Sequence, residues 1–389
     1  MPFSLAPTRR TVPLRRGSIR AGREALNRYF GGADVHLFGS GTEALTAVLA
    51  ECASGHRTST PEVVIPAYGC PDLVSACMGA GVFPRLVDVA VEGWGYDLRS
   101  LSRSLSSCTV AVVAVNLLGV GDDAESLAKL SRDAGAALIQ DSAQHLPRNA
   151  KSWPGDFQIL SFGRGKPLNL LRGGAAIGPL RQVANEDISI RSRILGTRSA
   201  GLLFNIATHP RVYPWLTHLP GLSLGATRYH HPRVPARLPE RAWKQLDVAF
   251  LDYRSCVTYT TQPYHQYMEA WDAIGLRRLC SATGSGSSAD ADVLRLAMLA
   301  PSEALRNKLV SHLEQAGLGA SAFYGKALSR IESVPDVVRA QGPFPNAEKL
   351  ACRLFTLPTH QGVNARIAAQ IDGLLQSLLR GNPPSGAVA

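Results

Sequence analysis

The sequence predicts an α/β protein, with a large three-layer domain on a mainly parallel sheet and a smaller α+β C-terminal domain. Short apolar runs alternate with helical runs of about ten residues between positions 35 and 140, as in right-handed βαβ units. The chain has 389 residues and 45% hydrophobic content, enough for a large core and two domains. We expect an N-terminal basic arm and helix at 1–34, the large domain at 35–240, and a linking helix with the small domain at 241–389.

The first half of the chain supplies the alternating elements. Arg23 to Phe30 is predicted to form a short helix that ends at Gly31-Gly32. Strands are expected at 35–38, 63–66, 84–89, 110–115 and 137–140, and helices at 44–53, 72–79, 98–105 and 124–134. Strands joined in this way lie parallel with helices on both faces, and ligands bind at their carboxyl ends.

The second half predicts the small domain. Residues 238–270 are expected to form one long helix, because Leu246, Phe250 and Tyr253 keep a core spacing. A polar, flexible linker is expected at 281–288. An apolar strand is predicted at 294–299, and helices at 302–316, 347–354 and 365–379.

A turn of small residues, Gly39 to Leu45, joins the first strand to the next helix. Such a turn leaves free backbone N–H groups at a helix N-terminus, where the helix dipole also favours an anion such as phosphate. Thr42 adds a hydroxyl to this turn. Serine and threonine also cap helices that bind no ligand, so a plain N-cap is the alternative.

Asp141 directly follows the apolar run 137–140, which places it at a strand tip beside a buried crevice. A carboxylate there needs a partner. The partner is a structural arginine or backbone amides in one interpretation. In the other it is a protonated ring nitrogen, because a pyridinium beside Asp141 would act as the electron sink that pyridoxal phosphate chemistry requires.

Lys166 stands in a glycine- and proline-containing break between the apolar runs 157–162 and 175–178. Apolar surroundings disfavour the ammonium, so the free amine becomes available, as a Schiff-base lysine requires. An exposed loop lysine is the alternative. The turn at 39–45, Asp141, and Lys166 preceded by Ser161 occur in the order that a pyridoxal-phosphate site needs.

The net charge of +11 is unevenly distributed. Seven arginines face one glutamate in residues 1–30, and seven more stand in the acid-free stretch 188–239. Such surfaces attract nucleic acid, anionic lipid or phosphorylated small molecules. The alternative is a solvated basic surface that has no specific partner. We expect no nucleic-acid partner, because interleaved aromatics and known DNA-binding motifs are missing.

Composition also limits the compartment and the metals. The seven cysteines are scattered without a CxxC pair, so neither a disulfide framework nor a metal site is expected. No apolar run of 18 residues predicts a membrane span, and residues 1–20 lack the apolar core of a secretory signal. A reducing cytoplasm fits best.

The chain resembles the DegT/StrS group of pyridoxal-phosphate-dependent sugar aminotransferases, which have the type I fold of aspartate aminotransferase. The Ser161–Leu168 segment is the most specific match and the Ser-Gly-Thr turn the least specific. The matching segments are Ser40-Gly-Thr-Glu-Ala-Leu45, Val64-Ile-Pro-Ala-Tyr68, Leu117-Leu-Gly119, Gln140-Asp-Ser-Ala-Gln144, Gly155-Asp156, Ser161-Phe-Gly-Arg-Gly-Lys-Pro-Leu168 with Gly173-Gly174, and Leu357-Pro-Thr-His360.

The resemblance implies a role for each site residue. Lys166 would form the internal aldimine with pyridoxal 5′-phosphate and move protons between cofactor and substrate. Asp141 would pair with the pyridine nitrogen, and Gln144 would hydrogen-bond the 3-oxygen. The phosphate would be held by Gly41, Thr42 and Ser161. A lysine at 166 also separates this chain from the dehydratase members, which carry histidine there.

Some positions depart from the family pattern. Cys70 stands where the family usually stacks an aromatic ring on the cofactor, and Tyr68, on the same strand face, is the alternative. Asn116 replaces a frequent histidine. The family's Gly-Tyr-Asn-Tyr-Arg motif is not recognisable, and the stretch 188–239, with its paired His230-His231, stands in its place. The asparagine that the family sends to the partner subunit's site is therefore not assigned to a residue of this chain.

The resemblance therefore predicts an aminotransferase, with glutamate as the expected donor and a keto-sugar on a nucleoside diphosphate as acceptor, for polysaccharide or secondary-metabolite biosynthesis. The seven arginines of 188–239 would offer a surface that binds the diphosphate, with Arg228 and Arg233 as the pair to neutralise in a test. They are Arg191, Arg193, Arg198, Arg211, Arg228, Arg233 and Arg237. One alternative is a pyridoxal-phosphate enzyme for a non-nucleotide keto substrate. Another is a non-catalytic relative that binds an anionic partner. The resemblance also implies a homodimer, since the family builds its sites at a two-fold interface.

Overall fold

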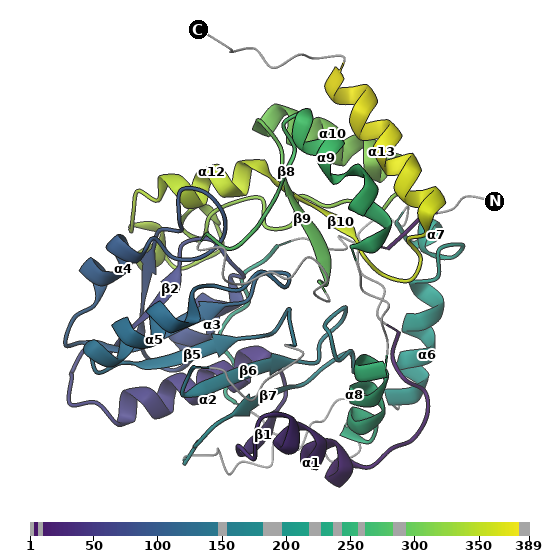
Figure 1. The fold of residues 1–389 in the computed structure, drawn as a ribbon. Coiled ribbons are helices and arrows are strands. Elements are labelled where there is room, and N and C mark those ends of the chain that lie inside the picture. The colour runs from purple at the N-terminus through teal and green to yellow at the C-terminus, as the bar shows by residue number, and fades with distance from the viewer. Residues whose placement is uncertain are drawn as a thin grey trace, which may run out of the picture.

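The structure is a computed structural model in which a large sheet domain lies below a smaller domain (Figure 1). It describes residues 4–6, 11–146, 154–181, 197–217, 227–235, 243–255, 261–282 and 293–380. Within these residues the strands form two sheets, one of seven strands and one of three. No helix of the described ranges has the length and apolar character needed to cross a membrane.

The large sheet has the order β1-β7-β6-β5-β4-β2-β3. Its strands are β1 (Val35–Phe38), β2 (Glu62–Pro66), β3 (Phe83–Val87), β4 (Thr109–Val115), β5 (Ala137–Asp141), β6 (Phe157–Ser161) and β7 (Gly174–Ile177). All pairings from β3 to β6 are parallel, whereas β7 runs antiparallel to both β6 and β1. The predicted α/β fold with a mainly parallel sheet is confirmed.

Helices cover both faces of this sheet, which gives the expected three layers. They are α1 (Ile19–Tyr29), α2 (Gly41–Ser54), α3 (Asp72–Gly79), α4 (Leu98–Ser104), α5 (Ala124–Asp133) and α8 (Leu246–Ser255). Val63 and Ile65 of β2 pack with α2 and α3, while Val64 between them packs with α4 and α5. This alternation follows from the period of two along a strand, and it explains why the buried strands read as continuous apolar runs.

The C-terminal residues build a second core on the antiparallel sheet β10-β9-β8. Its elements are β8 (Arg277–Arg278), β9 (Arg295–Leu299), β10 (Leu354–Pro358), α9 (Met268–Ala273), α10 (Glu303–Gln315) and α13 (Ala365–Arg380). Two helices between β9 and β10, α11 (Asp336–Arg339) and α12 (Pro345–Arg353), pack instead into the main core of the large domain. Leu5 of the N-terminal arm is buried in this core, so the two ends of the described chain meet in the small domain.

The predicted long helix at 238–270 is wrong in its second half. Helix α8 packs against α1 in the large domain, with Phe250 in the core as expected. Further on, Gln262–Tyr267 forms a 3₁₀ helix with Pro263 in its first turn, and α9 starts only at Met268. A proline lacks the N–H that a continuing α-helix needs. Residues 238–242, 256–260 and 283–288, the last within the predicted linker, lie outside the described residues.

Two further helices, α6 (Thr197–Ala207) and α7 (Tyr213–Thr217), fall in the basic stretch 188–239. Helix α6 is tied to the N-terminal arm, since the side chain of Asn205 accepts from the Val12 N–H and donates to its carbonyl oxygen. The side chains of Arg191, Arg193, Arg198 and Arg237 lie outside the described part of the structure.

Candidate active site

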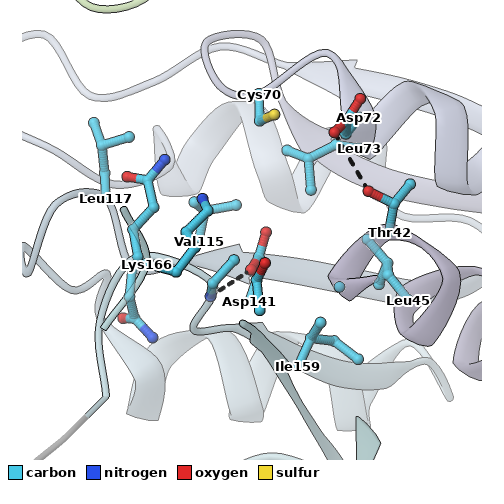
Figure 2. Close-up of a pocket in the computed structure, with 15 residues that line it drawn as sticks. Thr42, Leu45, Cys70, Asp72, Leu73, Val115, Leu117, Asp141, Ile159 and Lys166 are labelled. Carbon is cyan, nitrogen blue, oxygen red and sulfur yellow. Dashed lines mark hydrogen bonds between the residues drawn. The ribbon is translucent and has the colours of Figure 1, made fainter. Parts of the chain in front are cut away.

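All the side chains predicted for the site line one pocket, which contains about 620 Å³ of space including the part open to solvent (Figure 2). The seven residues are Gly41, Thr42, Cys70, Asp141, Gln144, Ser161 and Lys166. They come from the start of α2 and from the carboxyl ends of β2, β5 and β6. This is the edge at which parallel α/β sheets bind ligands.

The start of α2 lies directly against the end of β6. A Cβ atom on Gly41 would lie 2.9 Å from the Cβ of Ser161, so only glycine permits this approach. Ser40 caps the helix by accepting from the Glu43 N–H at 3.1 Å. The capping function that the sequence left open thus belongs to Ser40. The hydroxyls of Thr42 and Ser161 face the pocket, beside a helix N-terminus that favours an anion.

Asp141 is the last residue of β5, and its carboxylate points into the pocket. Its Oδ1 atom accepts from the Ala143 N–H at 2.9 Å. Burial raises the pKa of this carboxyl, partly opposed by the Ala143 N–H and the nearby Lys166 charge. The described residues provide a backbone amide as partner and no arginine ion pair. A cationic ring nitrogen would stabilise the carboxylate that burial disfavours.

Gln144 is held in one orientation by two hydrogen bonds. Its Oε1 atom accepts from the Leu118 N–H at 3.1 Å, and its Nε2 atom donates to the Tyr324 hydroxyl at 2.8 Å. Leu118 has φ 55°, a conformation that non-glycine residues rarely adopt and that concentrates at functional sites. The second N–H of the Gln144 amide has no partner among the described residues, so it is available to a ligand in the pocket.

Lys166 lies in the loop after β6, where its N–H donates to the Gly163 carbonyl at 3.2 Å and Gly165 adopts φ 69°. Its side chain is half-buried in the pocket, so it is not an exposed loop lysine. Its positive charge partly opposes the burial that raises the pKa of Asp141 and of Cys70. Within the described ranges its amine forms no ion pair, which leaves it free to react.

Cys70 and Tyr68 have separate locations. Cys70 lines the pocket, and burial raises the pKa of its thiol to about 11. Tyr68 is fully buried between Trp94 and Tyr324, with ring centroids 6.3 and 6.0 Å away, and it is not among the pocket-lining residues. Tyr68 is therefore not positioned to replace the stacking ring.

A second pocket of about 550 Å³ adjoins the first and shares Thr42 and Asp72 with it. Its other wall is the segment 227–235, from which His230, His231 and Arg233 face the space. The sequence analysis did not identify Asp72 or Tyr324 as site residues. No group of three or more histidine, cysteine or acidic side chains in the described residues is arranged to hold a metal ion.

A sequence model of the DegT/DnrJ/EryC1/StrS aminotransferase family matches residues 18–192 and 264–375. The chain belongs to this family. Members of the family are pyridoxal-phosphate enzymes. The residues present here fit that cofactor: a glycine-spaced helix start for a phosphate, a buried carboxylate for a ring nitrogen, and a half-buried amine in the same pocket.

Relatives of this DegT/StrS chain have different products. It is 27% identical to 3-amino-5-hydroxybenzoate synthase of Amycolatopsis mediterranei (strain S699) over 39% of each chain. It is 30% identical to GDP-perosamine synthase of Vibrio cholerae over 34% of this chain and 36% of the relative. The matches thus span well under half of these relatives. Helicobacter pylori PseC, an aminotransferase of pseudoaminic acid biosynthesis, shares the fold, with a TM-score of 0.68, 16% identity, and 97% and 100% of the two chains covered.

Proposed function

We propose that this chain is a pyridoxal-phosphate-dependent aminotransferase that moves an amino group from glutamate to a keto-sugar carried on a nucleoside diphosphate. The observation that supports it most is that Lys166, Asp141 and the Gly41–Thr42 turn meet in one pocket. Membership of the aminotransferase family supports the reaction type. The relatives named for sugar nucleotides, such as GDP-perosamine synthase, support the acceptor class.

The chain's own groups have distinct tasks in this proposal. Bound pyridoxal phosphate supplies an electron sink for the substrate carbon. The Lys166 amine would hold the cofactor and, once freed by the donor amine, would move a proton between cofactor and substrate. Asp141 would keep the ring nitrogen protonated, and the second N–H of the Gln144 amide would donate to the 3-oxygen. The Gly41 N–H and the hydroxyls of Thr42 and Ser161 bind the phosphate.

Arg228 and Arg233 are exposed on the segment 227–235, and Arg233 lines the second pocket. We assign them to the acceptor's diphosphate, because guanidinium groups bind phosphate oxygens bidentately. Replacing both by glutamine should raise the KM for the nucleotide substrate by about tenfold or more and leave the KM for glutamate unchanged. An unaltered acceptor KM would remove this assignment.

A second candidate is a pyridoxal-phosphate enzyme for a keto substrate without a nucleotide. The similarity to a relative named 3-amino-5-hydroxybenzoate synthase favours it, and it needs no diphosphate-binding arginines. Glutamate turnover with a panel of nucleotide and non-nucleotide keto compounds separates the two. A third reading is a non-catalytic relative with an anionic partner; it predicts salt-sensitive binding to that partner and no cofactor uptake.

The deciding experiment is the absorption spectrum of the chain with added pyridoxal phosphate, before and after borohydride. We expect a long-wavelength band, fixation of the cofactor by borohydride, and loss of both in Lys166→Ala. The matched control is Lys129→Ala, which removes a lysine from an exposed pair with Asp133 on α5. A wild-type chain that neither colours nor retains cofactor would remove the proposed function.

We also propose a homodimer. Leu202, Leu203 and Ile206 of α6 and Trp215 of α7 are exposed large apolar side chains. Apolar surface of this kind is typical of an interface. Light scattering should give twice the chain mass of 41.6 kDa, and replacing Leu203 and Ile206 by serine should shift it towards the monomer.

A further inference from the structure

Thr42, Asp72 and His230 form a hydrogen-bonded chain between the two pockets. The Thr42 hydroxyl donates to Asp72 Oδ2 at 3.4 Å, which Figure 2 shows as a dashed line. The other oxygen, Oδ1, lies 2.9 Å from His230 Nδ1. Asp72 is the first residue of α3, and its side chain is one-third exposed. Its negative charge acts inside the site, because it adds to the burial that raises the pKa of Cys70 and of Asp141.

Asp72 accepts a hydrogen bond from the Thr42 hydroxyl, which is the group that the proposed function assigns to the cofactor phosphate. A hydroxyl has one proton to donate, so Thr42 serves either the carboxylate or the phosphate at any moment. The two acceptors are also both anions, and like charges in one site repel each other. Asp72 therefore opposes phosphate binding twice, through the shared donor and through its charge.

His230 acts on Asp72 from the opposite side. Its place is fixed by the Ser75 hydroxyl, which donates to the His230 carbonyl oxygen at 2.6 Å. The groups around this pair carry both signs: Glu43, His231 and Arg233 line the same pocket. His230 Nδ1 pairs with Oδ1 of Asp72, the oxygen that Thr42 does not use, so this hydrogen bond does not compete for the Thr42 hydroxyl.

We propose that Asp72 is a positioning residue that competes with the cofactor phosphate for the Thr42 hydroxyl, and that His230 relieves this competition by holding Asp72. The inference rests on the proposed function, since it presumes that pyridoxal phosphate binds here. It assigns to the chain a built-in limit on its affinity for phosphorylated ligands. A lower affinity makes it easier for the phosphorylated cofactor to leave the site.

The test is equilibrium binding of pyridoxal phosphate and of pyridoxal, which lacks the phosphate, to the cofactor-free chain. Asp72→Asn keeps the shape and removes the charge, so its Kd for pyridoxal phosphate should fall about three- to tenfold, with little change for pyridoxal. A structural role would weaken binding, so the direction of the change is diagnostic. Asp72→Ser repeats the test in case the asparagine variant misfolds, and Asp133→Asn on α5 controls for the loss of one exposed carboxylate.

His230→Gln should raise the Kd for pyridoxal phosphate about threefold, and this effect should vanish in the Asp72→Asn background, because His230 acts through Asp72. Weaker or unchanged phosphate-dependent binding in both Asp72 variants would overturn the inference. An equal His230 effect in both backgrounds would also overturn it. If the wild-type chain binds no pyridoxal phosphate at all, the proposed function itself fails, which is a separate outcome.

Discussion

Gln144 and Tyr324 lie 180 residues apart, yet the Gln144 amide donates to the Tyr324 hydroxyl at 2.8 Å. Tyr324 also lowers the pKa of the nearby Cys70 thiol, against the larger effect of burial. The segment around Tyr324 is held on the large domain by the Leu328 N–H, which donates to the Ala67 carbonyl at 2.8 Å. A residue beyond α10 thus helps to fix the Gln144 side chain of the pocket.

Tyr324→Phe tests this link. The ring keeps its packing against Tyr68 and Phe323, while the hydroxyl and its hydrogen bond with Gln144 are lost. We expect about 1 kcal/mol less free energy of unfolding, several-fold weaker binding of pyridoxal phosphate, and a shifted absorption maximum, because the Gln144 amide loses its fixed orientation. Tyr267→Phe is the control, since that ring only stacks on Trp271. Unchanged cofactor affinity and spectrum in Tyr324→Phe would show that Gln144 needs no such support.

The sequence could predict the pocket because its parts are local. Gly41, Asp141 and Lys166 each follow a recognisable apolar strand, and parallel strands bring their carboxyl ends to one edge of the sheet. The contribution of Tyr324 had no local signal, because it depends on how the chain beyond α10 returns to the large domain. The same holds for the pairing of Asp72 with His230, 158 residues apart.

Other features of the structure differ from what the apolar spacing predicts, and the reasons are local. Tyr68 and Cys70 share a face by alternation, but the strand β2 ends at Pro66, so the period of two no longer applies to them. The helical spacing at 246–253 is real, but Pro263 replaces the expected helix with a 3₁₀ turn. The loop 162–173 between β6 and β7 contains Gly163, Gly165 and Pro167 and forms no crossover helix, so β7 returns antiparallel to β6.

Gly41→Ala should damage the site through sterics alone. The added Cβ would meet the Ser161 Cβ at 2.9 Å and the Leu160 carbonyl at 3.3 Å, so α2 must move away from β6. We expect a loss of about 1–3 kcal/mol in stability and weaker pyridoxal-phosphate binding, measured by denaturation and absorption titration. Gly55→Ala at the other end of α2 is the control, because its nearest neighbour would be 3.7 Å away and its φ is −79°. Equal behaviour of the two variants would contradict the close-approach argument.

Cysteine alkylation should be ordered by pKa. Hydrogen bonds from the hydroxyls of Thr58 and Thr60 lower the pKa of Cys108, whereas burial raises that of Cys70 to about 11. A lower pKa gives more thiolate at a given pH, so Cys108 should react with iodoacetamide well before Cys70 at pH 7.5. Peptide mass spectrometry over pH 6–9 measures both rates. Thr58→Val should slow Cys108 and leave Cys70 unchanged, and faster labelling of Cys70 would refute the ordering.

Leu5 should stabilise the small domain although it lies at the start of the chain. It is 1% exposed in the C-terminal core, and its N–H donates to the Gly317 carbonyl at 2.7 Å. His360, whose Nε2 atom lies 2.9 Å from the Ala6 carbonyl oxygen, holds the next residue of the arm. Leu5→Ala removes buried methyl groups and leaves a cavity, so the free energy of unfolding should fall by about 2–4 kcal/mol.

The fluorescence of Trp271, which is buried in the same core, reports this loss during denaturant unfolding. Val91→Ala is the control, because Val91 is 61% exposed and its shortening should change stability by less than about 0.5 kcal/mol. Four other tryptophans also fluoresce, namely Trp94, Trp153, Trp215 and Trp243, so far-UV circular dichroism is recorded in the same titration. A Leu5→Ala chain as stable as Val91→Ala would show that the arm rests on the small domain without strengthening it.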